Sequence, residues 1–177
     1  MPVKGWCSRV VDKSGKVSEV LFLDYDNILY RIVEDELKYL MEEYNLSPFY
    51  VFISKEKKDS NGETYGNYMA VCLTKNTFRQ VVQMQNELHV DSAYKRIALT
   101  YRFKTWVLRL GPKGKKGRPI FKEIVGDVKK THPQDVSNAH LQALRAIYPE
   151  IPKIKYKNLD KNNIKNLFVS EYKTASR

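Results

Sequence analysis

The apolar run at residues 20–23, followed by Asp24 and Asp26, constrains the fold of this chain more than any other feature of its sequence. An apolar run this short, closed by Asn27, predicts a buried β-strand. Alternation along a strand places residues 24 and 26 on one face and Tyr25 on the other. The sequence therefore predicts a buried strand that delivers two carboxylates to its end.

Two carboxylates a few ångströms apart repel each other unless a cation, a basic side chain or a proton lies between them. A hard divalent ion such as Mg²⁺ or Mn²⁺ suits such a pair, because it takes oxygen ligands and keeps room for phosphate oxygens. A second interpretation stays open, in which one Asp caps the following helix and the other is solvated. Asp-x-Asp is a common pattern, so the surrounding sequence has to decide between the two.

The distribution of charge supplies that context. The chain carries a net charge of +11, and residues 95–130 contain twelve Lys and Arg but only the acids Glu123 and Asp127. Residues 19–45 are acidic, and residues 153–177 are basic again. A concentrated basic stretch in an otherwise mixed protein is typical of a polyanion partner, and DNA or RNA is the first candidate. Anionic membrane and simple solubility are the alternatives.

Length and composition indicate one domain of a soluble globular protein. The chain has 177 residues, of which 42% are hydrophobic and 29% charged. No apolar stretch is long enough to span a membrane, and the N-terminus lacks the apolar core of a signal peptide. Cys7 and Cys72 have no metal-ligand spacing, which favours a reducing intracellular location, in the cytoplasm, at a nucleoid or in the host cell of a virus.

The order of predicted elements indicates an α/β (α+β) fold. A helix over residues 31–45 follows the first strand, residues 48–54 and 67–73 form a hairpin, and Thr74 to Asn76 cap a second helix. A connector with Asp91 leads to a strand over 102–110, a basic turn, and a partner strand at 120–125. This β-α-β-β-α-β-β order predicts the ferredoxin-like split β-α-β plan, which RNA-recognition-motif domains also use.

We expect three parts along the chain: an N-terminal segment over residues 1–15, the ferredoxin-like domain over 16–130, and a helical basic extension over 131–177. The extension contains a helix near 138–148 and a Lys/Asn-rich tail with a short docking helix.

The ferredoxin-like plan would bring the acid pair beside the basic strands in one sheet. Phosphate contacts are then expected from Arg102, Lys104, Arg109, Lys113, Lys115, Lys116 and Arg118. Trp106 and Phe103 either stack on bases or belong to the core, and for Trp106 the core is favoured. The glycine-punctuated loop at 111–119 lacks the spacing of a phosphate-binding P-loop and is interpreted as a basic finger on a nucleic-acid backbone.

The stretch Leu21-Phe22-Leu23-Asp24-Tyr25-Asp26-Asn27 resembles the first motif of the archaeo-eukaryotic primase superfamily and its plasmid and viral relatives. The basic stretch over residues 105–119 is similar to the strand and loop that follow in some members from mobile elements. The resemblance implies a replication protein that acts on DNA or RNA with other replication proteins. It also implies metal-dependent nucleotidyl transfer, with Asp24 and Asp26 as catalytic metal ligands and Asp91 as the nearest candidate for a third.

Two departures from the superfamily pattern keep other functions open. Residues 66–71 lack the histidine of the second motif, and the strand over 102–110 lacks an acid. The alternatives are a catalytically inactive DNA- or RNA-binding module and an adaptor for an acidic protein partner. A third is a rolling-circle-type endonuclease using Tyr101 and Lys104 in a Tyr-x-x-Lys pattern, although no His-x-His metal site accompanies them.

Overall fold

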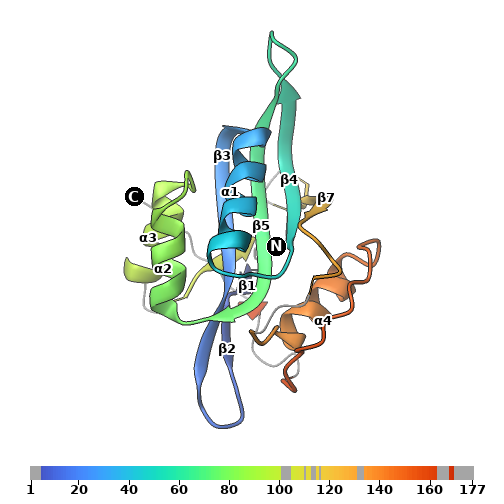
Figure 1. The fold of residues 1–177 in the computed structure, drawn as a ribbon. Coiled ribbons are helices and arrows are strands. Elements are labelled where there is room, and N and C mark those ends of the chain that lie inside the picture. Colours follow the sequence, from blue (N-terminus) through green and yellow to red (C-terminus); the bar gives the residue numbers. More distant parts are fainter. Residues whose placement is uncertain are drawn as a thin grey trace.

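The computed structural model describes residues 5–100, 105–109, 111, 112, 115, 117–130, 134–162, 168 and 169. These residues form four helices and two antiparallel sheets (Figure 1). Along the chain the elements are β1 (Gly5–Cys7), β2 (Arg9–Val11), β3 (Val17–Leu29), α1 (Tyr30–Glu43), β4 (Phe49–Lys58), β5 (Thr64–Asn76), α2 (Phe78–Asn86), α3 (Ser92–Thr100), β6 (Val107–Arg109), β7 (Ile120–Val125), α4 (Asn138–Ile147) and β8 (Phe168–Val169).

The larger sheet has the strand order β2-β3-β5-β4-β7, and every neighbouring pair is antiparallel. Helix α1 connects β3 to β4, and β5 lies between these two strands in the sheet. Helices α1 and α2 pack against this sheet, and Figure 1 shows α1 in front of β3 and β5. Val33, Leu37 and Leu40 on α1 are fully buried, as the helical spacing predicts.

The smaller sheet, β6-β1-β8, contributes to the cover of the other face of the larger sheet. The ring centroid of Trp6 on β1 lies 5.0 Å from that of Phe22 on β3, and His140 on α4 lies 5.2 Å from Trp6 and 6.0 Å from Phe22. All three side chains are fully buried. Nearby, the buried Glu19 carboxylate accepts hydrogen bonds from Ser8 and Thr105. These bonds join β3 to the residue between β1 and β2 and to the segment that leads into β6.

Local sequence signals account for most of these elements. The predicted hairpin is present as β4 and β5, and the helix after Thr77 begins with a capping box between Thr77 and Gln80. Ser137 caps α4 by accepting from the His140 N–H, which confirms the helix predicted near 138–148. The general α/β class is likewise confirmed, whereas a complete ferredoxin-like arrangement is not.

The predicted pairing of the basic strands is wrong. Strand β6 pairs with β1 in the smaller sheet, and β7 pairs with β4 at the edge of the larger sheet. Packing explains the separation: Phe121 on β7 lies edge-on to Phe52 on β4, with ring centroids 5.9 Å apart. Trp106, just before β6, stacks at 5.0 Å on Phe78 of α2. The N-terminal segment, for which no strand was predicted, supplies β1 and β2.

The free edge of β3 is closed by side chains and a loop instead of by a strand after α2. Beyond Val20, the main chain of β3 faces the α2–α3 region, where Gln85 donates to the Phe22 carbonyl at 3.0 Å and the Asp91 N–H donates to the Asp24 carbonyl at 2.8 Å. The predicted connector with Asp91 contains α3. In the C-terminal tail, most of the predicted docking helix lies outside the described residues, and Phe168 belongs to β8.

Candidate nucleic-acid interface

Asp24 and Asp26 lie within β3 and not at its end, because the strand continues to Leu29. Asp24 is half-buried and Asp26 is exposed, on the opposite side of β3 from the buried Tyr25. Asn27 has a φ of +50°, and the register with β5 shifts between Tyr25 and Ile28. The N–H of Asn27 donates to the side-chain oxygen of Asn67 on β5 at 2.9 Å, which anchors this irregular stretch.

Asp91 is brought to the acid pair by α3. Its main-chain N–H donates to the Asp24 carbonyl, and its carboxylate accepts from the Tyr94 N–H at 2.8 Å. This second contact is typical of an N-terminal helix cap, so the carboxylate of Asp91 begins α3. Asp91 is close enough to influence the charge of Asp24.

Burial, followed by repulsion from Asp26 and then Asp91, raises the pKa of Asp24 to about 7, and Arg109 acts in the opposite direction. A carboxyl that titrates near neutral pH is typical of sites that bind cations or move protons, although structural clusters also produce such shifts. The three acids thus form one electrostatic group, with Asp24 and Asp26 on β3 and Asp91 beside the edge of that strand. A neighbouring positive charge would return Asp24 to its ionised form.

The three acids do not form a closed metal site. Among the residues that the structure describes, no group of three or more His, Cys, Asp or Glu side chains is arranged to hold a metal ion. Magnesium, however, is commonly held by one or two carboxylates together with substrate phosphates. Asp24 and Asp26 therefore fit such an ion only with a phosphate-bearing partner, and metal ligation by Asp91 stays a prediction.

Basic side chains from β4 and β6 flank the acids. Arg109 on β6 is half-buried, donates to the Gly111 carbonyl at 2.9 Å and influences Asp24. Beside Asp26 lies an open depression of about 300 Å³. Its lining comprises Asp26, Asn27, Lys55, Lys57, Tyr65, Gly66 and Asn67.

Lys55 and Lys57 were not identified as site residues from the sequence, because they follow an apolar strand and resemble a solvated turn. The observed register pairs Lys55 with Asn67 and Lys57 with Tyr65, and the Lys57 ammonium lies 4.7 Å from the centre of the Tyr65 ring. The sequence signal that could have identified them is their spacing. Lys55 and Lys57 are two residues apart, as are Tyr65 and Asn67 on the partner strand, so each pair shares a face of the hairpin.

Of the seven residues predicted to contact phosphate, the structure describes Arg109, Lys115 and Arg118. Arg109 lies beside the acids, Lys115 is exposed, and Arg118 is held at the C-terminal end of α4. The Arg118 guanidinium donates to the Ile147 carbonyl at 3.0 Å and lies 5.0 Å from the centre of the Tyr148 ring. The other four, Arg102, Lys104, Lys113 and Lys116, lie outside the described residues.

The remaining predictions concern the aromatic residues, the two cysteines and membrane-spanning helices. Trp106 is fully buried, which confirms the core interpretation, while Tyr101 and Phe103 lie outside the described residues. Cys7 and Cys72 are buried free thiols. Within the described part of the chain, no helix has both the length and the apolar character needed to cross a membrane.

Comparisons of this chain with known protein families, with curated proteins and with solved structures found no match.

Proposed function

We propose that this protein binds DNA or RNA on the exposed part of the sheet face around Asp24, as a replication-type module related in design to primases. The observation that supports this proposal most strongly is the half-buried carboxyl of Asp24. The charges of Asp26, Asp91 and Arg109 are close enough to shift its pKa. We call the surface formed by Asp24, Asp26, Lys55, Lys57 and Asn67 the open half of the face. Carboxylates there serve no purpose in simple phosphate binding, where they repel the ligand.

Charge supports nucleic acid as the ligand. The net charge of +11 favours association with any polyanion, and Lys55, Lys57 and Arg109 bring positive groups to the acid pair. Phosphate contacts of this kind depend strongly on salt and little on base sequence. The predicted basic residues at 102–118 would extend the same surface.

The acid pair supports phosphoryl or nucleotidyl transfer as the chemistry. Asp24 and Asp26 would hold Mg²⁺ or Mn²⁺ once phosphate oxygens complete its coordination, and the ion would supply charge stabilisation at the transferred phosphoryl group. The pKa of Asp24, at about 7, lets this carboxyl release its proton when the cation binds. The resemblance of residues 21–27 to the first primase motif points the same way.

A binding-only module is the second candidate. It is favoured by the strand at Gly66 to Val71, which supplies no histidine, and by the lack of a three-ligand group among the described residues. In this case the protein would bind DNA or RNA and leave nucleotide transfer to other replication proteins.

Nucleic-acid binding is tested by a filter-binding series across salt concentrations with single-stranded and duplex DNA and RNA. Lys55→Glu/Lys57→Glu should weaken binding roughly 10- to 100-fold, because two phosphate contacts become repulsions. Lys13→Glu/Lys16→Glu makes the same change in net charge on the β2–β3 turn and should stay within about threefold of the wild type. Equal losses in both variants would reduce the binding to overall charge, and no binding by the wild type would favour an adaptor for an acidic protein.

Catalysis is tested by primer synthesis and strand cleavage in the presence of Mg²⁺ or Mn²⁺, comparing the wild type with Asp24→Asn/Asp26→Asn. Loss of activity with retained nucleic-acid binding would establish an enzyme. Cleavage that leaves a covalent protein–DNA product would instead support the rolling-circle alternative. An inactive wild type, with a variant that binds equally or more tightly, would establish the binding-only module.

A further inference from the structure

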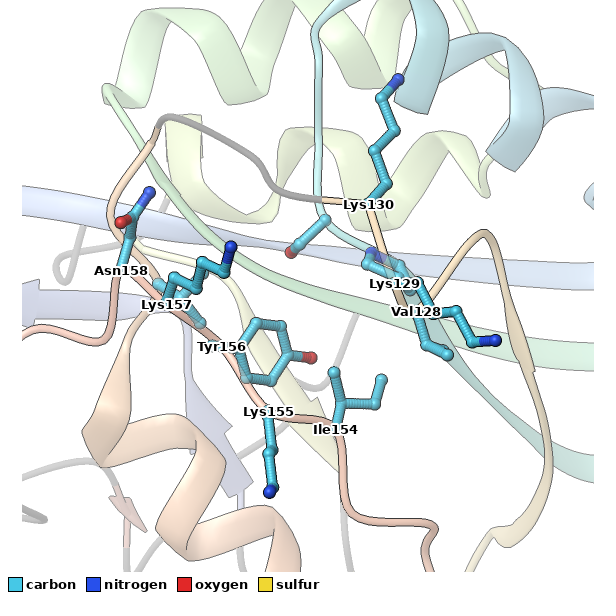
Figure 2. A pocket seen from close by; sticks show the side chains of 11 residues that line it. Val128, Lys129, Lys130, Ile154, Lys155, Tyr156, Lys157 and Asn158 are labelled. Atoms are coloured by element: carbon cyan, nitrogen blue, oxygen red, sulfur yellow. The ribbon is translucent and has the colours of Figure 1, made fainter.

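A second basic site lies away from the acid pair, between residues 128–130 after β7 and residues 154–158 after α4 (Figure 2). It is a small pocket of about 50 Å³, and no acidic side chain is among the described residues that line it. The lining comprises Ser47, Pro48, Val128, Lys129, Lys130, Val136, Ile154, Lys155, Tyr156, Lys157 and Asn158. We call this the lysine pocket, after Lys129, Lys130, Lys155 and Lys157.

The four lysines are unneutralised. Ion pairs elsewhere involve Lys75, Lys122 and other basic residues, whereas none of the four pocket lysines pairs with an acid within the described ranges. All four are exposed. Four positive charges from two segments repel each other, so an anion between them would relieve that repulsion.

The first wall of the lysine pocket is preformed by a turn at Asp127. The carboxylate of Asp127 accepts from the Lys129 N–H at 2.9 Å, and its carbonyl accepts from the Lys130 N–H at 3.3 Å. Such a turn fixes the backbone that presents the two lysines. Gly126, just before it, has a φ of +125° and lies against Met41 and Pro48, which ties the turn to the body of the sheet.

The second wall is held by three different elements. The Tyr156 and Tyr50 hydroxyls are 2.7 Å apart, the Val136 N–H donates to the Asn158 carbonyl at 2.8 Å, and Arg145 on α4 donates to the Ile154 carbonyl at 3.0 Å. Figure 2 shows Tyr156 and Lys157 extending into the space between the two walls. Lys130 and Lys155 extend away from it in opposite directions, and their flexible stems allow the ammonium groups to turn toward a ligand.

The lysine pocket is linked to the sheet face of Asp24 through the hydrogen bond between the Tyr156 and Tyr50 hydroxyls. Tyr50 on β4 is opposite Val71 on β5, and Val71 is opposite Phe22 on β3, two residues before Asp24. Residues in this register, and residues two apart on one strand, share a face. By strand geometry Tyr50 is roughly 10 Å across the sheet and about 7 Å along it from Asp24.

We propose that the lysine pocket binds a phosphate group of the nucleic-acid strand that the open half of the face engages, as a second anchor; this inference rests on the proposed function. The pocket, at about 50 Å³, has room for a few water-sized groups and therefore for a phosphate. Lysine ammonium groups bind phosphate as point charges without a fixed geometry. A phosphate held in the lysine pocket, together with contacts at the open half, would fix the direction in which the nucleic acid passes Asp24 and Asp26.

The full-length protein provides the test. Lys129→Gln/Lys157→Gln removes two positive charges from the pocket, and Lys153→Gln/Lys161→Gln removes two from exposed positions outside its lining. The pocket variant should bind a single-stranded oligonucleotide about 5- to 30-fold more weakly, with a salt dependence reduced by up to two phosphate contacts. The control should lie within about twofold of the wild type, and both variants should keep its unfolding temperature.

A titration with inorganic phosphate at constant ionic strength separates free phosphate from a strand as the ligand. The amide signals of Tyr156 and Asn158 should shift saturably in the wild type and not in the pocket variant. Phosphate-induced shifts with unchanged oligonucleotide affinity would assign the pocket to a small free anion and overturn the proposal. So would equal weakening by both variants, or no shift at all. If the wild type binds no oligonucleotide, the proposed function itself fails, whatever the phosphate titration shows.

Discussion

Two parts of one sheet face, only two residues apart on β3, have opposite characters. Phe22 is sealed beneath Trp6 and His140, which we call the covered half of the face. Asp24, on the same face, begins the open half and is only half-buried. The difference arises from what covers the strand, because β1 and α4 lie over Phe22 whereas Asp26 borders an open depression.

The two halves also treat their ionisable groups differently. His140 in the covered half is neutral, since burial lowers its pKa to about 4. Its ring nitrogens lie 2.7 Å from the Ser137 hydroxyl and 2.7 Å from the Cys7 carbonyl oxygen. Asp24 in the open half instead meets two further acids, and its pKa rises to about 7. Polar groups such as His140 are stable in a core when they are hydrogen-bonded. Repulsion among the carboxylates around Asp24 is instead reduced when a cation binds there.

The largest expected effect comes from opening the covered half. Trp6→Ala should lower the free energy of unfolding by roughly 3–5 kcal/mol, because a fully buried indole is replaced by a cavity between β3 and α4. Denaturation in guanidinium chloride measures the loss. Leu99→Ala on α3, where 59% of the side chain is exposed, is the control and should change stability by less than about 0.5 kcal/mol. A similar small change for Trp6→Ala would contradict the sealed core.

A smaller loss should follow from crowding the open half. A Cβ on Gly66 would lie 2.0 Å from the Lys55 carbonyl oxygen, so Gly66→Ala must displace β4 from β5 next to Asp26. We expect a loss of about 1–3 kcal/mol in the free energy of unfolding, together with weaker nucleic-acid binding. Gly117→Ala is the matched control, because an added Cβ there meets nothing within 4 Å. If Gly66→Ala were as stable as the wild type, β4 and β5 could separate at Lys55 without a measurable loss of stability.

The smallest expected effect has the opposite sign. Asp24→Asn should raise the free energy of unfolding by about 1–2 kcal/mol at pH 8, because it removes a repelled charge from a half-buried position. The pKa of Asp24 is higher in the folded protein, about 7, than its ordinary value of 3.8. This carboxyl therefore makes wild-type stability fall as pH rises between those values, and the advantage of the variant should grow over the same window and level off above it.

Denaturant unfolding of both proteins from pH 4 to pH 8 measures this difference. His140 contributes in the other direction, since its lowered pKa makes stability fall as pH falls from 6.5 to about 4. Subtracting the wild-type curve from the Asp24→Asn curve removes that common contribution. A difference that does not vary with pH would mean that Asp24 has the same pKa in the folded and unfolded protein, which would contradict the repulsion described here.

Local sequence patterns were sufficient for the elements whose signals lie within a few residues. The apolar spacing of Val33, Leu37 and Leu40 predicted α1, and a segment rich in aromatic and β-branched residues followed by the Asn61-Gly62 turn predicted the β4–β5 hairpin. The placement of Asp24 and Asp26 on one face of β3, opposite Tyr25, followed from the period of a strand. These features depend on side-chain periodicity and turn chemistry, which the sequence states directly.

The tertiary structure alone decided which strands pair and which charges meet. The basic stretch over 105–125 reads as one hairpin, yet β6 joins β1 and β7 joins β4, because burial of Trp106 and of Phe121 against distant partners outweighs local pairing. The approach of Asp91 to Asp24, and of residues 128–130 to residues 154–158, likewise joins segments far apart in the chain. Such contacts depend on how whole elements pack, and no pattern within a single segment contains that information.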